Sequence, residues 1–256
     1  MRLSILVLWM VGCAPRSKPP SVQTAPETPH ETPTTPETLM PKANLILFTS
    51  ASNRADDLRS LLVGGADIVA RTEPGTSSWY ALEGSDGQFG IFDTFRDASA
   101  QQAHFEGQVA EALQAQASDL VVGGWNGVLE GVRSFDLVAQ TPRRPGAATQ
   151  GMVIPLRAAP GQADALHDLL VQGASLVAAQ EPGTLHWFAL QDDADPDRLA
   201  IVDFFADDAG REAHFAGNVA AALEAAAPTL VVGGWQQGVL NGAMAFEVRA
   251  MTSPSE

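Results

Sequence analysis

The sequence has little cysteine and little positive charge. One cysteine among 256 residues excludes a disulfide within the chain. Fifteen Lys and Arg stand against 30 Asp and Glu, a formal net charge of −15 with neutral histidines. No run of basic residues interrupts this acidity. Because such a surface repels phosphate groups, we expect no nucleic-acid partner and no direct attraction to anionic lipid headgroups.

Long hydrophobic runs are scarce, and the most notable one lies at the start. The nine residues Leu3–Val11 are mostly apolar and follow Arg2, too short a run for a membrane span and typical of a signal peptide. Val-Gly-Cys at its end resembles the bacterial lipobox, which implies removal of residues 1–12, lipidation of Cys13 and membrane contact through that anchor alone. Ala14 after the cysteine favours the outer membrane, facing the periplasm. The alternative is an ordinary secretory leader, in which Cys13 is incidental.

A proline-rich segment follows the cysteine. Residues 14–41 contain eight prolines and six threonines and hardly any large apolar side chain. Such a segment cannot offset the entropy lost on ordering, so residues 13–42 are predicted to be a disordered linker.

The rest of the chain is internally repeated. Glu-Pro-Gly-Thr at 73–76 returns at 181–184, an offset of 108 residues. Ala-His-Phe at 103–105 and Leu-Val-Val-Gly-Gly-Trp at 120–125 return 110 residues later. The two extra residues fall in a Gly/Asp-rich turn, where duplicated folded units tolerate insertion. We predict two repeats, at 43–141 and 150–250.

Each repeat predicts the order β-α-β-β-α-β. A short apolar strand precedes a helix with a leucine stripe, which Glu-Pro-Gly-Thr ends. Two strands, a second helix around Phe105 or Phe215 and an alternating strand complete the repeat. This is a ferredoxin-like α+β unit, with both helices on one face of an antiparallel sheet. The other face is also apolar, so the two sheets are predicted to close into one barrel, leaving the chain monomeric as a fused pseudo-dimer.

A resemblance to a known family rests on one segment from each repeat. These segments are EPGTSSWYAL…FGIFDTFRDASAQQAHFEGQVAEAL and EPGTLHWFAL…LAIVDFFADDAGREAHFAGNVAAAL. Both resemble the antibiotic biosynthesis monooxygenase (ABM) domain of the dimeric α/β-barrel superfamily. That family includes cofactor-free oxygenases of quinol-like aromatics, haem-degrading enzymes and members without a known reaction. The resemblance implies a barrel cavity for a small apolar or aromatic molecule, with oxygenation that needs no cofactor. The alternatives are a non-catalytic binding or scaffolding protein, and haem binding.

Two pairs of repeated residues are candidates for chemistry. His104 and His214 recur on the second helix, where an imidazole could border the lumen as a base, ligate haem, or serve as a half-buried structural residue. Asp93 and Asp203 lie mid-strand between aromatic residues. A carboxylate there needs a partner, so we expect each to accept a hydrogen bond from the histidine of its own repeat; the alternative is a sheet-edge carboxylate facing water.

Aromatic residues of the second strand are candidates for ligand contact. Trp79 and Trp187 alternate with Tyr80 and Phe188, so one pair should face the helices and the other the lumen. Core packing is the competing interpretation. Tyr80 is the single tyrosine, which limits tyrosine-assisted oxygenation to one repeat. No metal cluster or phosphate loop is visible, and no cofactor is predicted. The two Gly-Gly-Trp segments fit either a lid or a folded turn.

Overall fold

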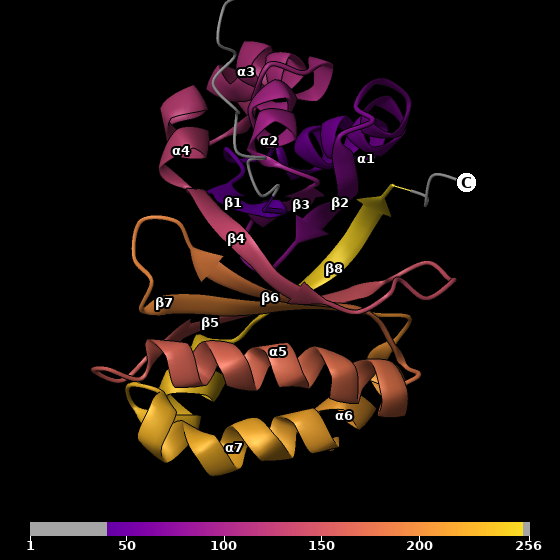
Figure 1. The fold of residues 1–256 in the computed structure, drawn as a ribbon. Helices are drawn as coiled ribbons and strands as arrows, with labels where there is room; N and C mark the ends of the chain where they lie inside the picture. The colour runs from indigo at the N-terminus through magenta and orange to yellow at the C-terminus, as the bar shows by residue number, and fades with distance from the viewer. Residues whose placement is uncertain (1–39, 253–256) are drawn as a thin grey trace, which may run out of the picture. The chain divides into compact units, whose positions relative to one another are not determined.

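The strands of residues 40–252, the part that the computed structural model describes, close into one barrel (Figure 1). Every neighbouring pair is antiparallel, in the order β1-β3-β2-β8-β5-β7-β6-β4. The strands are β1 (Lys42–Thr49), β2 (Thr76–Glu83), β3 (Gln88–Phe95), β4 (Val132–Gln140), β5 (Gln150–Arg157), β6 (Thr184–Asp192), β7 (Arg198–Phe205) and β8 (Met244–Met251). The predicted leader, Cys13 and most of the predicted linker lie outside the described residues.

Helices follow the strands in the same order in both halves. The first half has α1 (Ala55–Thr72), α2 (Ala98–Phe105), α3 (Gln108–Leu120) and α4 (Gly124–Glu130). The second has α5 (Ala163–Gln180), α6 (Asp208–Phe215), α7 (Asn218–Leu230), a π-helical turn η1 (Trp235–Val239) and a 3₁₀ turn η2 (Leu240–Gly242). The structure confirms the predicted α+β class. None of the helices between residues 40 and 252 is both long and apolar enough to cross a bilayer.

The last strand of each half joins the sheet of the other half. β4 pairs with β6, placing Leu137 opposite Leu190, and β8 pairs with β2, placing Leu82 opposite Val248. These pairings convert two four-stranded sheets into one closed barrel without a free edge. The predicted closure of the two repeats on each other is therefore confirmed.

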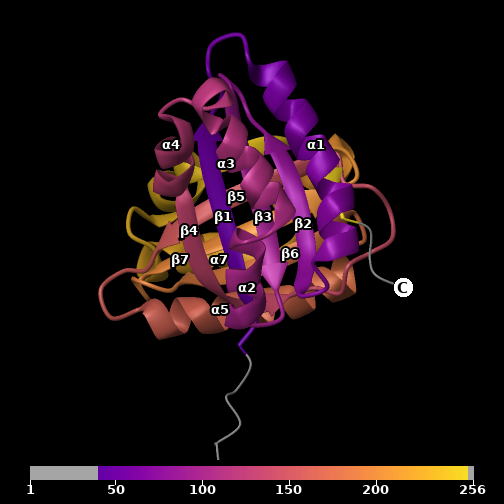
Figure 2. The same cartoon turned by 90° about the horizontal axis from the view of Figure 1, so that it is seen from above.

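The two faces of the sheet bury different side chains. Helices α1 to α4 cover the strands of the first half, and α5 to α7 cover those of the second (Figures 1 and 2). Inside the barrel, the Tyr80 and Phe204 rings stack with centroids 3.7 Å apart, and Phe92 meets Phe188 edge-on at 4.9 Å. These aromatic and aliphatic side chains pack together as one core cluster inside the barrel.

The first helix of each repeat approaches the sheet closely. A Cβ atom at Gly65 would lie 3.3 Å from the Trp79 ring, and one at Gly173 would lie 3.4 Å from the Trp187 ring. The missing side chain thus makes room for a tryptophan between helix and strand. This explains why both helices accept the cost of about 1 kcal/mol of an internal glycine.

The second helix of each repeat is two helices. Asp97 accepts a hydrogen bond from the Ala100 amide at 2.7 Å and so starts α2, which ends at Phe105. After Gly107 the chain restarts as α3. The Gly-Gly-Trp segments are folded turns, because Gly123 takes a φ of 77° ahead of α4 and Trp125 packs against the core beneath it.

Candidate functional site

Each repeated histidine contacts the aspartate that the sequence predicted. α2 holds His104 over the outer face of β3, with Nε2 3.0 Å from Asp93 Oδ2. In the second repeat, His214 Nε2 lies 3.1 Å from Asp203 Oδ2. Both aspartates are fully buried, and their oxygens have no aligned hydrogen bond, so each contact is an ion pair. The predicted pairing is present in both halves.

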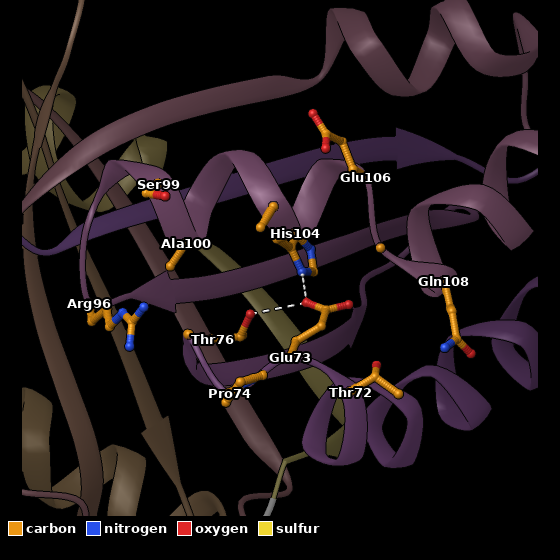
Figure 3. A pocket seen from close by; sticks show the side chains of 13 residues that line it. Thr72, Glu73, Pro74, Thr76, Arg96, Ser99, Ala100, His104, Glu106 and Gln108 are labelled. Carbon is orange, nitrogen blue, oxygen red and sulfur yellow. Dashed lines mark hydrogen bonds and ion pairs between the residues drawn. The ribbon is translucent and has the colours of Figure 1, made fainter.

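The other nitrogen of each imidazole contacts a glutamate that the sequence analysis missed. His104 Nδ1 lies 2.5 Å from Glu73 Oε2 (Figure 3), and in the second repeat His214 Nδ1 lies 2.5 Å from Glu181 Oε2. Glu73 directly follows α1, and the Thr76 hydroxyl donates to it at 3.1 Å. The repeated Glu-Pro-Gly-Thr was the available signal, but we assigned it only to ending the helix.

Two carboxylates make each histidine a cation. Burial opposes charge on the imidazole, but the adjacent Asp and Glu outweigh it and raise the pKa of both His104 and His214 to about 10. Burial also raises the pKa of Asp203. At neutral pH both ring nitrogens are protonated, and each lies against a carboxylate. Neither His104 nor His214 therefore has a free lone pair with which to act as a base or to bind haem iron.

The two Glu–His pairs open to the outside of the barrel. A cavity of about 390 Å³ borders Glu73, Pro74, Arg96 and His104, between the end of α1 and α2 (Figure 3). A cavity of about 300 Å³ borders the equivalent residues of the second repeat. Because Asp93 and Asp203 face the helices, the histidines do not border the lumen, and that interpretation is corrected.

The aromatic residues divide between the two faces as alternation predicted. Trp79 and Trp187 pack beneath the helices, whereas Tyr80 and Phe188 face the interior. Of the three residues proposed as ligand walls, Phe188 alone faces the lumen. The tryptophans are fully buried core residues.

Tyr80 has a polar partner at one end of the barrel. Its hydroxyl lies 3.1 Å from Nδ1 of His186, a residue of β6 in the other repeat. Beside this pair lies a cavity of about 460 Å³, lined by Ser77, Ser78, Gln140, Thr141, Pro142, Arg143 and His186. His186 was missed because the first repeat has Ser78 at the equivalent position, so comparison of the repeats did not select it.

The electrostatics of this end differ from those of the Glu–His–Asp groups. Burial, with the positive charge of Arg143, lowers the pKa of His186 to about 3, so its imidazole is neutral. Burial raises the pKa of Tyr80 to about 12, although Arg143 favours the phenolate. Within residues 40–252 no cluster of three or more His, Cys, Asp or Glu could hold a metal ion.

Comparison with known families identifies the second repeat. Residues 149–226 match the family model described as antibiotic biosynthesis monooxygenase, ABM. The second repeat is similar to an ABM domain over these residues. The matched residues run from the start of β5 into α7 and include Glu181, Asp203 and His214. The second-repeat Glu–His–Asp group thus lies within the matched segment. No curated protein matches the chain.

Solved structures share the fold of this protein over most of the chain. A candidate monooxygenase of Fusobacterium nucleatum has a TM-score of 0.72 at 12% identity, covering 84% of this chain and 95% of its own. One from Lactobacillus acidophilus has a TM-score of 0.67 at 13% identity, with 84% and 96% covered. An anthrone oxidase-like protein has a TM-score of 0.54 at 16% identity, with 85% and 94% covered. These likenesses establish the fold alone.

Proposed function

We propose that this ABM-fold protein binds a small molecule at the end of its barrel, beside Arg143 and His186. The observation that carries the proposal is the cavity of about 460 Å³ that reaches His186, whose other contact is the buried Tyr80 hydroxyl. Small-molecule sites usually measure roughly 300–1,000 Å³ and combine a few polar groups with an apolar wall. This cavity meets the size condition; its lining is mostly polar, with Pro142 as the apolar residue.

The neighbouring side chains favour an aromatic ligand. The His186 ring lies 3.9 Å from the Phe188 ring, and Tyr80 stacks on Phe204 just inside. Pro142 adds an apolar surface at the mouth. A flat ring entering beside His186 would extend this aromatic stack, in which offset and edge contacts are each worth about 1 kcal/mol.

Binding without acid–base chemistry by His104 and His214 fits the structure best. Both histidines are cations locked between carboxylates on the outer face, and neither faces this cavity. We assign them to stabilising the fold.

Cofactor-free oxygenation of a quinol-like compound is the second candidate. The Tyr80–His186 hydrogen bond favours it, because this pair lies beside the cavity and Arg143 would stabilise the anion of a bound quinol. Such a reaction would use Tyr80, the single tyrosine, and would occur at one place in the barrel.

The single tyrosine gives a direct test. Protein labelled with ¹³C-tyrosine has one phenol signal, which should shift as hydroquinone or phenol is titrated in; an unmoved signal with both would contradict binding here. An oxygen electrode with quinols and anthrones separates the two candidates. No oxygen uptake leaves binding alone, whereas uptake lost in Tyr80→Phe and kept in His104→Gln supports oxygenation at the barrel end.

We also propose that the protein is a lipoprotein of the cell envelope, monomeric as a fused pseudo-dimer. The short apolar run before Gly12 and Cys13 supports export and lipidation. Cells fed a palmitate analogue should label the wild-type chain and leave Cys13→Ser unlabelled. Label retained by that variant would contradict the anchor. Light scattering of the detergent-free globular part should give the mass of one chain.

A further inference from the structure

The cavity at the barrel end has no acidic lining residue. Its lining provides two serine hydroxyls, a threonine, the Gln140 carboxamide, the His186 imidazole and the Arg143 guanidinium. The cavities at the two Glu–His pairs contain Glu73 or Glu181, and the one beside β8 contains Glu83 and Glu247. In a chain of net charge −15, a cavity with one cation and no carboxylate is a distinct electrostatic environment.

Arg143 is placed to receive an anion. Among the described residues 40–252 no carboxylate oxygen lies within ion-pair distance of it, whereas Arg59, Arg157 and Arg249 each contact acidic side chains. Its guanidinium lies 6.0 Å above the Tyr80 ring centroid. The N–H groups of a guanidinium without a carboxylate partner match the two oxygens of a carboxylate ligand.

The site joins residues that the repeats do not share. Ser78 and His186 occupy equivalent positions, 108 residues apart, and both line the cavity. Tyr80 corresponds to Phe188 in the same way. The cavity therefore lies at the junction of the two halves, where the first repeat supplies a hydroxyl and a phenol and the second an imidazole and a phenyl ring. This asymmetry suits a ligand with one polar end.

We propose that the cavity selects a small aromatic carboxylate, whose two oxygens pair with the Arg143 guanidinium while its ring lies against His186 and Pro142. The inference rests on the proposed function and names its ligand class. Because His186 is neutral, the site presents one positive charge and matches a monoanion. Ser77 and Ser78 supply further donors to the carboxylate.

Benzoate and benzamide test the inference as a matched pair, since they share size and shape and differ in charge. Each is titrated into ¹³C-tyrosine-labelled protein at constant ionic strength, with the Tyr80 signal as the readout and calorimetry for affinity. We expect benzoate to bind about 10-fold or more tightly than benzamide, the ratio that a charged hydrogen bond gives. Arg143→Gln should abolish that preference. Arg71→Gln removes an equal charge from an exposed helix position and should leave it intact.

The outcomes separate the inference from the proposed function. Equal affinity for the two compounds, or a preference that survives Arg143→Gln, would overturn the carboxylate assignment while small-molecule binding stands. An unmoved Tyr80 signal with both compounds, and with neutral phenols, would overturn binding at this end of the barrel. Circular dichroism of each variant confirms that it is folded.

Discussion

Nδ1 of His104 lies 2.5 Å from Oε2 of Glu73, and this contact fastens the end of α1 to α2. The opposite nitrogen meets Asp93 on β3, so one imidazolium connects two helices and a strand. His214 does the same in the second half. A side chain with both nitrogens engaged holds the helical layer on the sheet, which is why we assign these groups to stability.

Removing one carboxylate should leave a buried charge without its partner. Asp93→Asn is expected to lower the free energy of unfolding by about 3 kcal/mol or more, the usual cost of breaking a buried pair on one side. Urea denaturation measures it. Asp168→Asn is the control, because that aspartate contacts His167 with a side chain 73% exposed, and it should change stability by about 0.5 kcal/mol or less. Equal effects of the two substitutions would contradict a structural role for the buried group.

Stability should fall at alkaline pH. The folded-state pKa of His104 and His214 is raised to about 10 from an ordinary value near 6.5. Their contribution is therefore complete below about pH 6.5 and is lost as the pH rises toward 10. Thermal unfolding between pH 6 and 10 should show a declining Tm, and NMR at pH 8 should show both imidazoles protonated. Imidazoles that are already neutral at pH 8 would refute the ion-pair assignment.

Gly107 leaves space for the Glu73 carboxylate. Its φ of −79° suits any residue, but a Cβ atom would lie 2.5 Å from Glu73 Oε1. Gly107→Ala should therefore displace that carboxylate, costing about 1–3 kcal/mol as overpacking does and lowering the pKa of His104. Gly64→Ala, in α1 with no atom within 4 Å of the new Cβ, should instead stabilise by about 0.5–1 kcal/mol. Measured gains for both variants would disprove the steric argument.

The two halves should unfold together. β4 is hydrogen-bonded to β6 and β8 to β2, so neither half retains its full sheet when the other opens. Hydrogen exchange followed by mass spectrometry should show β3 and β7 exchanging with the same free energy of opening. Separate transitions for the two strands would mean that the inter-repeat pairings contribute little.

Local patterns predicted the elements, because the residues that fix them are close in sequence. The leucine stripe of α1 follows from the helical period of 3.6 residues. The alternation of Trp79 and Tyr80, and the apolar inner faces by which the two sheets pack together, follow from the strand period of 2. The break between α2 and α3 escaped prediction because Phe105 and Val109 keep helical spacing across Gly107. Helical spacing of apolar residues does not show whether the helix is interrupted between two of those residues.

The candidate site depended on contacts between distant residues. The Asp93–His104 pair was predicted because a buried carboxylate requires a partner and each repeat offers one histidine. Glu73 was assigned to the chain turn, so its side chain was not considered. Tyr80 and His186 are 106 residues apart and occupy non-equivalent positions, and their contact arises only from the register in which the barrel closes. That register is a property of the whole sheet, not of any segment.

Covalent linkage of the two repeats changes what evolution can do at their junction. In an assembly of two identical chains, a histidine at the position of His186 would face its own copy across the symmetry axis, and any gain of function on one side would be duplicated on the other. Here His186 and Ser78, at equivalent positions of the two repeats, line the same pocket. A mutation in one repeat can therefore change one side of the shared pocket and leave the opposite side unchanged. Such a pocket can recognise a molecule whose two ends differ.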